Sequence, residues 1–258
     1  MKKSILTILC FSTMFFVKAQ TDETQPKSEG LVNYEEVLKF DIKLDSMPSE
    51  MQSMLPKEQR LKKVLYFNNE ISIYKKSSKN ENNETIQESE NGSMKIYISE
   101  PDEIVCKDFK NNKKIEQKDF MNRMFLVESD LDKLEWKLTG KQKMILGFPC
   151  QEATRQDSSD KIIAWFTPVI SNSTGPSEYG NLPGLILEID INNGNRTIIA
   201  KSVELKKIDD KQLAKPKKGK KVSKKEYDEI VSEKLKEMGE KNSGGTQIIM
   251  KMEYSTGN

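Results

Sequence analysis

The chain contains no histidine among its 258 residues. Ser-His-Asp and Cys-His catalysis both need an imidazole, and histidine is also a frequent zinc ligand and the side chain best suited to proton transfer near neutral pH. A phosphate-binding glycine motif and a dinucleotide fingerprint are absent from the sequence as well. The carboxylates show no spacing that singles out a catalytic pair. We therefore expect no enzymatic activity, no catalytic residue, and no bound metal or cofactor.

Cysteine is scarce, with three residues in the chain. Cys10 lies in the N-terminal apolar run, which leaves Cys106 and Cys150 for the folded part. An even number of cysteines in an exported protein indicates a disulfide, and closing a loop of that length would stabilise the fold by ~4 kcal/mol in the chain-entropy model. We expect a disulfide between Cys106 and Cys150, and two buried free thiols in separate strands are the alternative.

Long apolar runs are lacking beyond the N-terminus. Lys2 and Lys3 precede an apolar run from Ile5 to Val17, and Ala19 follows as a small residue. This pattern is typical of a secretory signal peptide, here 1–19, and the run is shorter than the ~20 residues that span a bilayer. We expect an exported protein of the periplasm or the outer-membrane periphery, with no transmembrane segment after cleavage. The mature chain would carry 39 basic and 40 acidic residues, which gives no indication of nucleic-acid binding.

Short strands separated by turn residues account for most of the remaining sequence. Loosely alternating apolar residues begin at 30–40, and short apolar runs continue as far as 196–205, with Asn, Asp, Gly or Pro in the gaps. Many short strands with close turns indicate an antiparallel, meandering sheet. We expect a mainly β (α+β) fold with this sheet over 30–208, preceded by a disordered segment at 20–29.

Methionines recur at helical spacing in one segment. Pro56 ends this segment, which predicts a short helix near 47–55. Thioethers are soft ligands that suit Cu(I), so periplasmic copper handling is one hypothesis for the function; the buried side of a short helix is the more usual reading. The methionines concerned are Met47, Met51 and Met54 in this segment and Met250 and Met252 near the C-terminus.

The last part of the chain, 209–258, differs from the strand region in composition. Ten lysines and two acidic residues lie in 206–225. One interpretation is a site for anionic lipid headgroups or an acidic partner; we favour a solvated linker, because charge runs with Pro and Gly are usually disordered. Ser223 and Glu226 then form a capping box, which predicts an amphipathic helix near 224–238, followed by a flexible tail.

The stretch from Lys161 to Ile191 carries two apolar strands joined by a loop rich in Ser, Asn, Gly and Pro. Its residues resemble the signature of the GLPGLI family of Bacteroidetes envelope proteins, with Asn181 in place of the first glycine, and further similarity extends over residues 30 to 240. The candidate binding or turn motif consists of Gly175, Pro176, Leu182, Pro183, Gly184, Leu185 and Ile186.

The module of this family is similar to the bowl-shaped N-terminal domain of some bacterial peptide-N-glycosidases. The catalytic domain of those enzymes has no counterpart in this sequence. The resemblance implies a curved antiparallel sheet, like a bowl or half-barrel, and partners among outer-membrane transport or surface proteins. We therefore predict a non-enzymatic binding or accessory protein. Trp136, Trp165 and Phe166 are core residues or, in a bowl, would line a concave apolar cavity. The second case gives an alternative function, a carrier of an apolar or lipid ligand.

Overall fold

The structure is a computed structural model that describes residues 28–39, 57–77, 84–89, 92–99, 102–157, 160–237 and 249–255. Most of these residues form β-strands, because apolar and polar side chains alternate along them and turn residues separate them. Twelve strands make one large sheet. They are β1 (Gly30–Lys39), β2 (Glu58–Phe67), β3 (Ile71–Lys76), β6 (Ile104–Asp108), β7 (Lys113–Phe120), β8 (Arg123–Asp130), β9 (Lys137–Ile145), β10 (Phe148–Asp157), β11 (Asp160–Thr167), β12 (Leu185–Ile191), β13 (Arg196–Leu205) and β14 (Lys220–Ser223).

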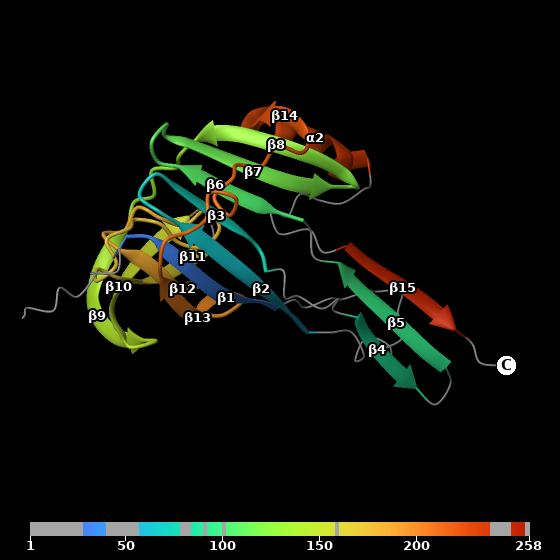
Figure 1. The fold of residues 1–258 in the computed structure, drawn as a ribbon. Coiled ribbons are helices and arrows are strands. Elements are labelled where there is room, and N and C mark those ends of the chain that lie inside the picture. Colours follow the sequence, from blue (N-terminus) through green and yellow to red (C-terminus); the bar gives the residue numbers. More distant parts are fainter. Residues whose placement is uncertain are drawn as a thin grey trace, which may run out of the picture.

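The large sheet consists of two antiparallel meanders. The first, called here the N-terminal meander, comprises β1, β2, β3, β6, β7 and β8; the second, the C-terminal meander, comprises β9 to β13. They join where β1 pairs with β13, from Gly30 opposite Leu205 to Leu38 opposite Arg196. The strand order runs from β14 at one edge to β9 at the other, so the sheet is open and is not closed into a barrel (Figure 1). The predicted mainly β, meandering fold is confirmed.

One strand departs from the antiparallel pattern. β14 pairs in parallel with β8, with Lys220 opposite Phe125, so the sheet is mixed. Parallel neighbours cannot be joined by a tight hairpin; here β9 to β13 lie between β8 and β14 in the chain, and residues 206–219 cross from β13 to β14. The tight hairpin between β12 and β13 has Asn192 and Asn193 at φ 52° and 55°, the left-handed conformation that Asn tolerates.

The helix α2 (Lys224–Glu237) follows β14 directly and confirms the predicted C-terminal helix. The backbone N–H of Glu226 donates to Ser223 Oγ at 3.2 Å, and that of Ser223 donates to a Glu226 carboxylate oxygen at 2.6 Å, so the capping box is formed. Tyr227 packs edge-on against Phe125 of β8, with ring centroids 5.5 Å apart. The helix therefore lies on the face of the sheet that carries Phe125, called here the inner face.

A second sheet has three antiparallel strands, β4 (Glu84–Ser89), β5 (Gly92–Ser99) and β15 (Ile249–Ser255), in the order β15-β5-β4. β15 lies in the segment for which we expected a tail. The helix expected at 47–55, the signal peptide, most of the segment 20–29 and the three methionines of 47–55 lie outside the described residues. In the part of the chain that is described, no helix has the length and apolar character needed to cross a membrane.

Candidate functional site

The loop between β11 and β12, residues 168–184, lies across the inner face. Its Thr174 hydroxyl is 3.0 Å from the hydroxyl of Ser72 on β3. The ammonium of Lys107 on β6 donates to the Gly175 carbonyl at 3.0 Å and also to the Tyr179 carbonyl. The loop belongs to the C-terminal meander and its partners to the N-terminal one. It therefore links the two meanders.

Two glycines of the candidate motif allow this loop to approach the sheet. A Cβ atom on Gly184, which has φ +152°, would lie 2.1 Å from the Thr167 carbonyl oxygen, and one on Gly175 would lie 2.8 Å from Cβ of Ile186. Any side chain at either position would overlap its neighbour. Asn181, where the signature has glycine, has φ 65°, a conformation that Asn adopts more readily than most residues.

The other motif residues serve packing. Leu182, Leu185 and Ile186 are almost completely buried, and the Ile186 carbonyl accepts a hydrogen bond of 2.5 Å from Tyr34 on β1. A buried apolar side chain contributes roughly 1.5–3 kcal/mol relative to an exposed one. The motif therefore ties the loop to the core.

The three candidate aromatic residues occupy different environments. Phe166 is fully buried in the core. Trp136 packs against the core, and its indole N–H donates to the Gly180 carbonyl at 2.8 Å. Trp165 is half-buried, with the ammonium of Lys143 4.3 Å from its ring centroid. Among the described residues, each of the three therefore has its own packing partner.

Charged side chains converge on the inner face, between the loop 168–184 and the helix α2. They come from β1, β6, β7, the segment after β8, the loop itself and β13, so both meanders contribute. Four are basic and four are acidic. This inner charged cluster consists of Glu36, Lys107, Lys114, Glu116, Lys118, Asp132, Glu178 and Arg196.

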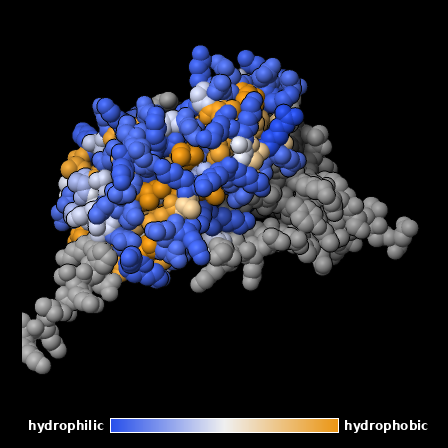
Figure 2. Space-filling model, turned by 45° about the horizontal axis from the view of Figure 1, so that its top comes forward, coloured by the Kyte–Doolittle hydropathy of each residue, from blue (hydrophilic) through white to orange (hydrophobic). Residues whose placement is uncertain are grey.

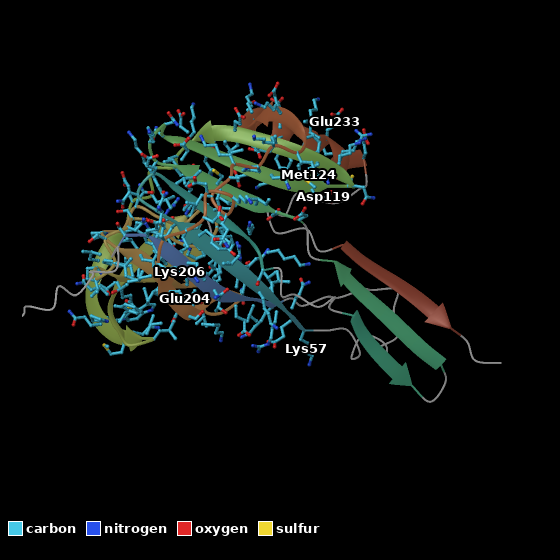
Figure 3. All side chains as sticks on the ribbon, viewed as in Figure 1. Lys57, Asp119, Met124, Glu204, Lys206 and Glu233 are labelled. Carbon is cyan, nitrogen blue, oxygen red and sulfur yellow. The ribbon has the colours of Figure 1, made fainter. Side chains whose placement is uncertain are left out.

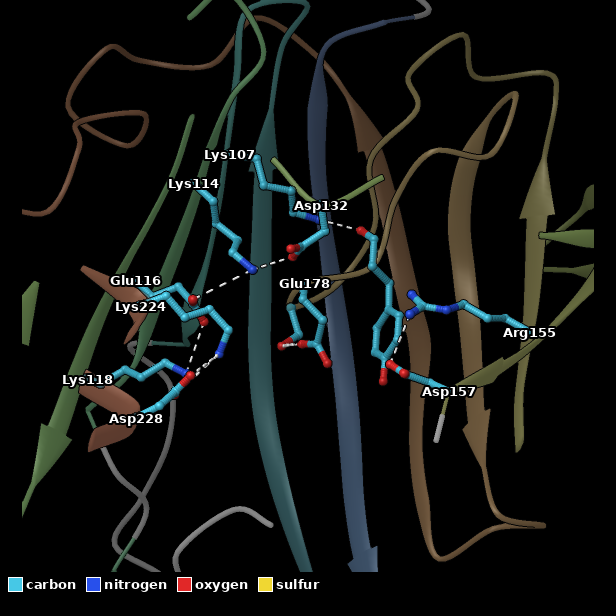
Figure 4. Close-up of polar contacts among 12 residues, drawn as sticks. Lys107, Lys114, Glu116, Lys118, Asp132, Arg155, Asp157, Glu178, Lys224 and Asp228 are labelled. Atoms are coloured by element: carbon cyan, nitrogen blue, oxygen red, sulfur yellow. Dashed lines mark hydrogen bonds and ion pairs between the residues drawn. The ribbon is translucent and has the colours of Figure 1, made fainter. Parts of the chain in front are cut away.

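Ion pairs connect the members of the cluster on β7. Lys118 Nζ lies 3.0 Å and Lys114 Nζ lies 3.7 Å from the two carboxylate oxygens of Glu116, and Lys114 also contacts Asp132. Figure 4 shows Lys114 between these two carboxylates. The side chains of Lys114 and Glu116 are only 6% and 10% exposed. Charges so deeply buried need partners of opposite sign, because desolvation is expensive.

The rest of the cluster is held from the β1–β13 junction and from the loop. Arg196 donates from Nε to a carboxylate oxygen of Glu36 at 2.7 Å. Burial alone would raise the pKa of the Glu178 carboxyl, but Arg196, Ser177 and Lys107 outweigh it and lower that pKa. Burial lowers the pKa of Lys107 from 10.5 to about 7. The loop thus inserts a carboxylate, that of Glu178, between two cations of the sheet.

The cluster has limited but real access to solvent. Lys118, Arg196 and Asp132 have side chains 27%, 24% and 42% exposed. Glu103 of the same region has a raised pKa, because burial disfavours its charged form. Of the paired charges in the cluster, those of Lys118, Arg196 and Asp132 are therefore the ones that solvent partly reaches.

The expected disulfide is wrong. Cys106 on β6 and Cys150 on β10 are both free and buried, and six strands lie between β6 and β10 in the sheet order. Neighbouring strands are about 4.8 Å apart, whereas bonded cysteines need Cα atoms within about 7 Å of each other. Burial raises the pKa of Cys106 to about 12 and that of Cys150 to about 11. Neither thiol is therefore activated as a nucleophile.

The inner charged cluster was not predicted from the amino-acid sequence. A signal for it exists in β7, where Lys114, Glu116 and Lys118 recur with period two and alternating sign. In a strand this period places all three side chains on one face. Such a row would ordinarily indicate a solvated face. The loop 168–184 and the helix α2 cover this row, and only that covering distinguishes a buried charged cluster from a solvated face.

The chain is similar to known proteins over most of its length. Residues 48–230 match the model of the family described as N-glycanase peptide, N-terminal domain. Two solved structures of PNGF-II, determined in different space groups, have TM-scores of 0.52 and 0.53 at 19% and 20% sequence identity. Each covers 80% of this chain but 33% of the PNGF-II chain, so this chain spans about a third of PNGF-II. At such identities the likeness concerns the fold.

The search among curated proteins gave no match. The family model, by contrast, matches well over half of the chain, from the segment before β2 into the helix α2. The matched range includes all members of the inner charged cluster except Glu36. The chain belongs to the family of the N-terminal domain of the N-glycanase peptide.

Proposed function

We propose that this protein is a non-enzymatic accessory module that holds a polar ligand on its inner face. The observation that carries the proposal is the inner charged cluster, in which both meanders and the loop 168–184 bring charged side chains to one place. The apolar side chains of the core are packed against one another beneath the loop. The groups open to a ligand on this face are therefore the charged ones, with Lys118, Arg196 and Asp132 partly exposed.

The charge balance of the cluster favours a particular class of ligand. A strongly charged ligand would leave half of the cluster facing a like charge, which is unfavourable at low dielectric. A neutral ligand rich in hydroxyl and amide groups can bond to both signs. The family is named after an N-glycanase. We therefore place the carbohydrate of a glycopeptide first among the candidate ligands.

A binding role agrees with the chemistry of the groups present. The chain has no histidine, and the Cys106 and Cys150 thiols have raised pKa values. The carboxylate of Glu178, with its lowered pKa, is an acceptor and not a proton donor at neutral pH. We further propose that the protein belongs among the GLPGLI proteins of the cell envelope, with an outer-membrane transport or surface protein as its partner. The residues of the loop 168–184 support this assignment.

Glycopeptide binding tests the proposal directly. The full chain would be titrated with N-glycopeptides and with the same peptides lacking the glycan, and binding would be followed by chemical-shift changes in nuclear magnetic resonance. Glu178→Gln and Lys118→Met should weaken binding about tenfold or more, because each removes a charge-assisted hydrogen bond. Glu188→Gln is the control, since Glu188 pairs with Lys143 away from the cluster. It should leave the affinity unchanged.

Other outcomes would contradict the proposal in different ways. Release of free glycan from the peptide, seen by mass spectrometry, would show an enzyme. Co-purification of a stoichiometric lipid with the protein would favour the carrier of an apolar ligand. Shift changes confined to residues remote from the inner face would place the ligand elsewhere.

A further inference from the structure

The crossover between β13 and β14 carries an unusual concentration of lysine. This segment, residues 206–219, is called here the basic strap. It passes from β13 to β14, two strands that are separated in the sheet by β1, β2, β3, β6, β7 and β8. It has six lysines against Asp209 and Asp210. Because it crosses so many strands, the strap spreads its lysines along a band of the sheet.

The strap is anchored on the face opposite to the inner charged cluster, called here the outer face. Ile208 and Leu213 are 3% and 6% exposed and pack in a cluster with Ile73 of β3 and Cys106 of β6. The Ile208 N–H donates to a carboxylate oxygen of Glu29 at 2.7 Å. In Figure 1 the strap passes over β3 and β6 as an orange trace. Its backbone is therefore held on the sheet while its polar side chains face outward.

The lysines of the strap divide into two groups. Lys206, labelled near Glu204 in Figure 3, pairs with it at 2.6 Å, and Lys215 pairs with Asp108 of β6. The other four are exposed and make no ion pair with any residue in the described ranges. These four are Lys207, Lys211, Lys217 and Lys218.

We propose that the outer face docks on an anionic lipid surface through these four lysines, with headgroup phosphates as the groups contacted. The strap contains lysine but no arginine and no aromatic residue. Arginine suits bidentate recognition of a defined group, and aromatic side chains suit stacking on bases. Lysine ammoniums on flexible stems are point charges, which suit a diffuse layer of phosphates. An anionic membrane presents such a layer.

The surroundings of the strap agree with an electrostatic contact. The face seen in Figure 2 is largely hydrophilic, with hydrophobic patches between the charged side chains. The net charge of the whole chain is only +2. Overall attraction to an anionic surface is therefore small, and local concentration of lysine must supply it. Each lysine near such a surface changes partitioning by roughly fivefold.

Vesicle sedimentation tests the proposal with the full chain. The probes are vesicles of phosphatidylcholine alone and of phosphatidylcholine mixed equally with phosphatidylglycerol. We expect binding to the mixed vesicles at about 0.05 M salt, its loss at about 0.5 M salt, and no binding to the neutral ones. The variant K207Q/K211Q/K217Q/K218Q should partition at least about tenfold less.

A matched variant separates the strap from overall charge. K57Q/K133Q/K137Q/K161Q removes the same charge from exposed lysines outside the strap and should change partitioning less than about twofold. Circular dichroism checks that both variants are folded. Equal weakening by both variants, or no binding of the wild type to mixed vesicles at low salt, would overturn the proposal. Strap-dependent binding to soluble polyglutamate but not to vesicles would overturn it in favour of an acidic protein.

Discussion

Two strands of the large sheet, β12 in the C-terminal meander and β7 in the N-terminal meander, bury their side chains in opposite ways. In the C-terminal meander, β12 carries a nearly continuous apolar run, and Leu185, Ile186, Leu187 and Ile189 are completely buried. In the N-terminal meander, β7 is mostly polar, yet Lys114 and Glu116 are 5% and 8% exposed. Burial of β12 therefore depends on apolar packing, and burial of the inner side chains of β7 depends on paired charges. The same open sheet therefore contains a region that depends on shape and a region that depends on charge.

The difference follows from what covers each region. β12 lies under the loop 168–184 and packs its apolar side chains into the core, whereas Glu188 and Asp190 of the same strand are only partly buried. β7 faces the cluster on one side only, and its inner side chains satisfy one another. Apolar packing tolerates no added volume, whereas a charge network tolerates no loss of a partner. Substitutions that add volume in the apolar region, or that remove one charged partner in the cluster, can therefore test the two regions separately.

The largest effect is expected from Gly184→Ala in the C-terminal meander. The added methyl would lie 2.1 Å from the Thr167 carbonyl oxygen, at φ +152°. Steric overlap and backbone strain together should lower the free energy of unfolding by about 4 kcal/mol. Gly140→Ala is the control, since Gly140 also has positive φ but nothing within 4 Å; it should cost about 1 kcal/mol. Urea unfolding followed by circular dichroism measures both, and equal losses would contradict the steric argument.

A smaller loss is expected from Glu116→Gln in the N-terminal meander. The change leaves Lys114 and Lys118 without the carboxylate they share. Breaking this buried network should cost about 2 kcal/mol, less than a fully dry pair because Asp132 still contacts Lys114. Glu128→Gln removes an exposed partner of Lys221 and should cost less than about 0.5 kcal/mol. The same unfolding titration compares them, and similar costs would mean that the cluster is effectively solvated.

The buried Lys107 should make stability depend on pH. Its pKa is lowered from 10.5 to about 7 in the folded protein by burial. Between these values the unfolded chain binds a proton that the folded protein does not, so the contribution of Lys107 to stability rises with pH, by up to about 1.4 kcal/mol per unit. Below pH 7 both states are protonated and the contribution is constant.

Comparison with Lys107→Met isolates this contribution. The tyrosines and cysteines with raised pKa values are shared by both proteins, so their effects cancel in the difference. The wild type should gain stability relative to the variant from pH 7 to pH 9, measured by denaturant titration at each pH. A difference that stays flat over this range would mean that Lys107 has an ordinary pKa.

The smallest effect concerns the thiols, one in each meander. Both are buried and unbonded, and burial raises the pKa of each. Cys106 and Cys150 should not react with a thiol reagent in the native protein, but both should react after denaturation without reductant. The number of reacted thiols is measured from the absorbance of the chromophore that the thiol reagent releases. If Cys106 and Cys150 failed to react even after denaturation, a disulfide between them would be indicated.

Some features could be predicted from neighbouring residues along the chain. The capping box at Ser223 and Glu226 predicted α2, and alternation with turn residues predicted a meandering sheet. Each of these signals depends on contacts within a few residues. The parallel pairing of β14 with β8 could not be predicted, because nothing local indicates which edge a strand joins after a crossover of fourteen residues.

The candidate site was predicted only in part. The motif around Gly175 and Gly184 was recognised, and the structure explains those two glycines by close contacts with Ile186 and the Thr167 carbonyl. Glu178, in the same loop, was not singled out, because its partners Arg196 and Lys107 are remote in the chain. The disulfide was predicted from the number of cysteines, and that number contains no information on the strands between them.

The amino-acid sequence by itself determined the strand-rich character of this protein, the position of its last helix and the absence of imidazole chemistry, since these depend on local periodicity and composition. Only the tertiary structure decided that Lys114 and Glu116 are buried as partners, that Cys106 and Cys150 remain apart, and that the lysines of 206–219 lie along one face. The physical reason is the same in each case. Burial and pairing are properties of the assembled sheet, in which residues far apart in the chain exclude water from one another.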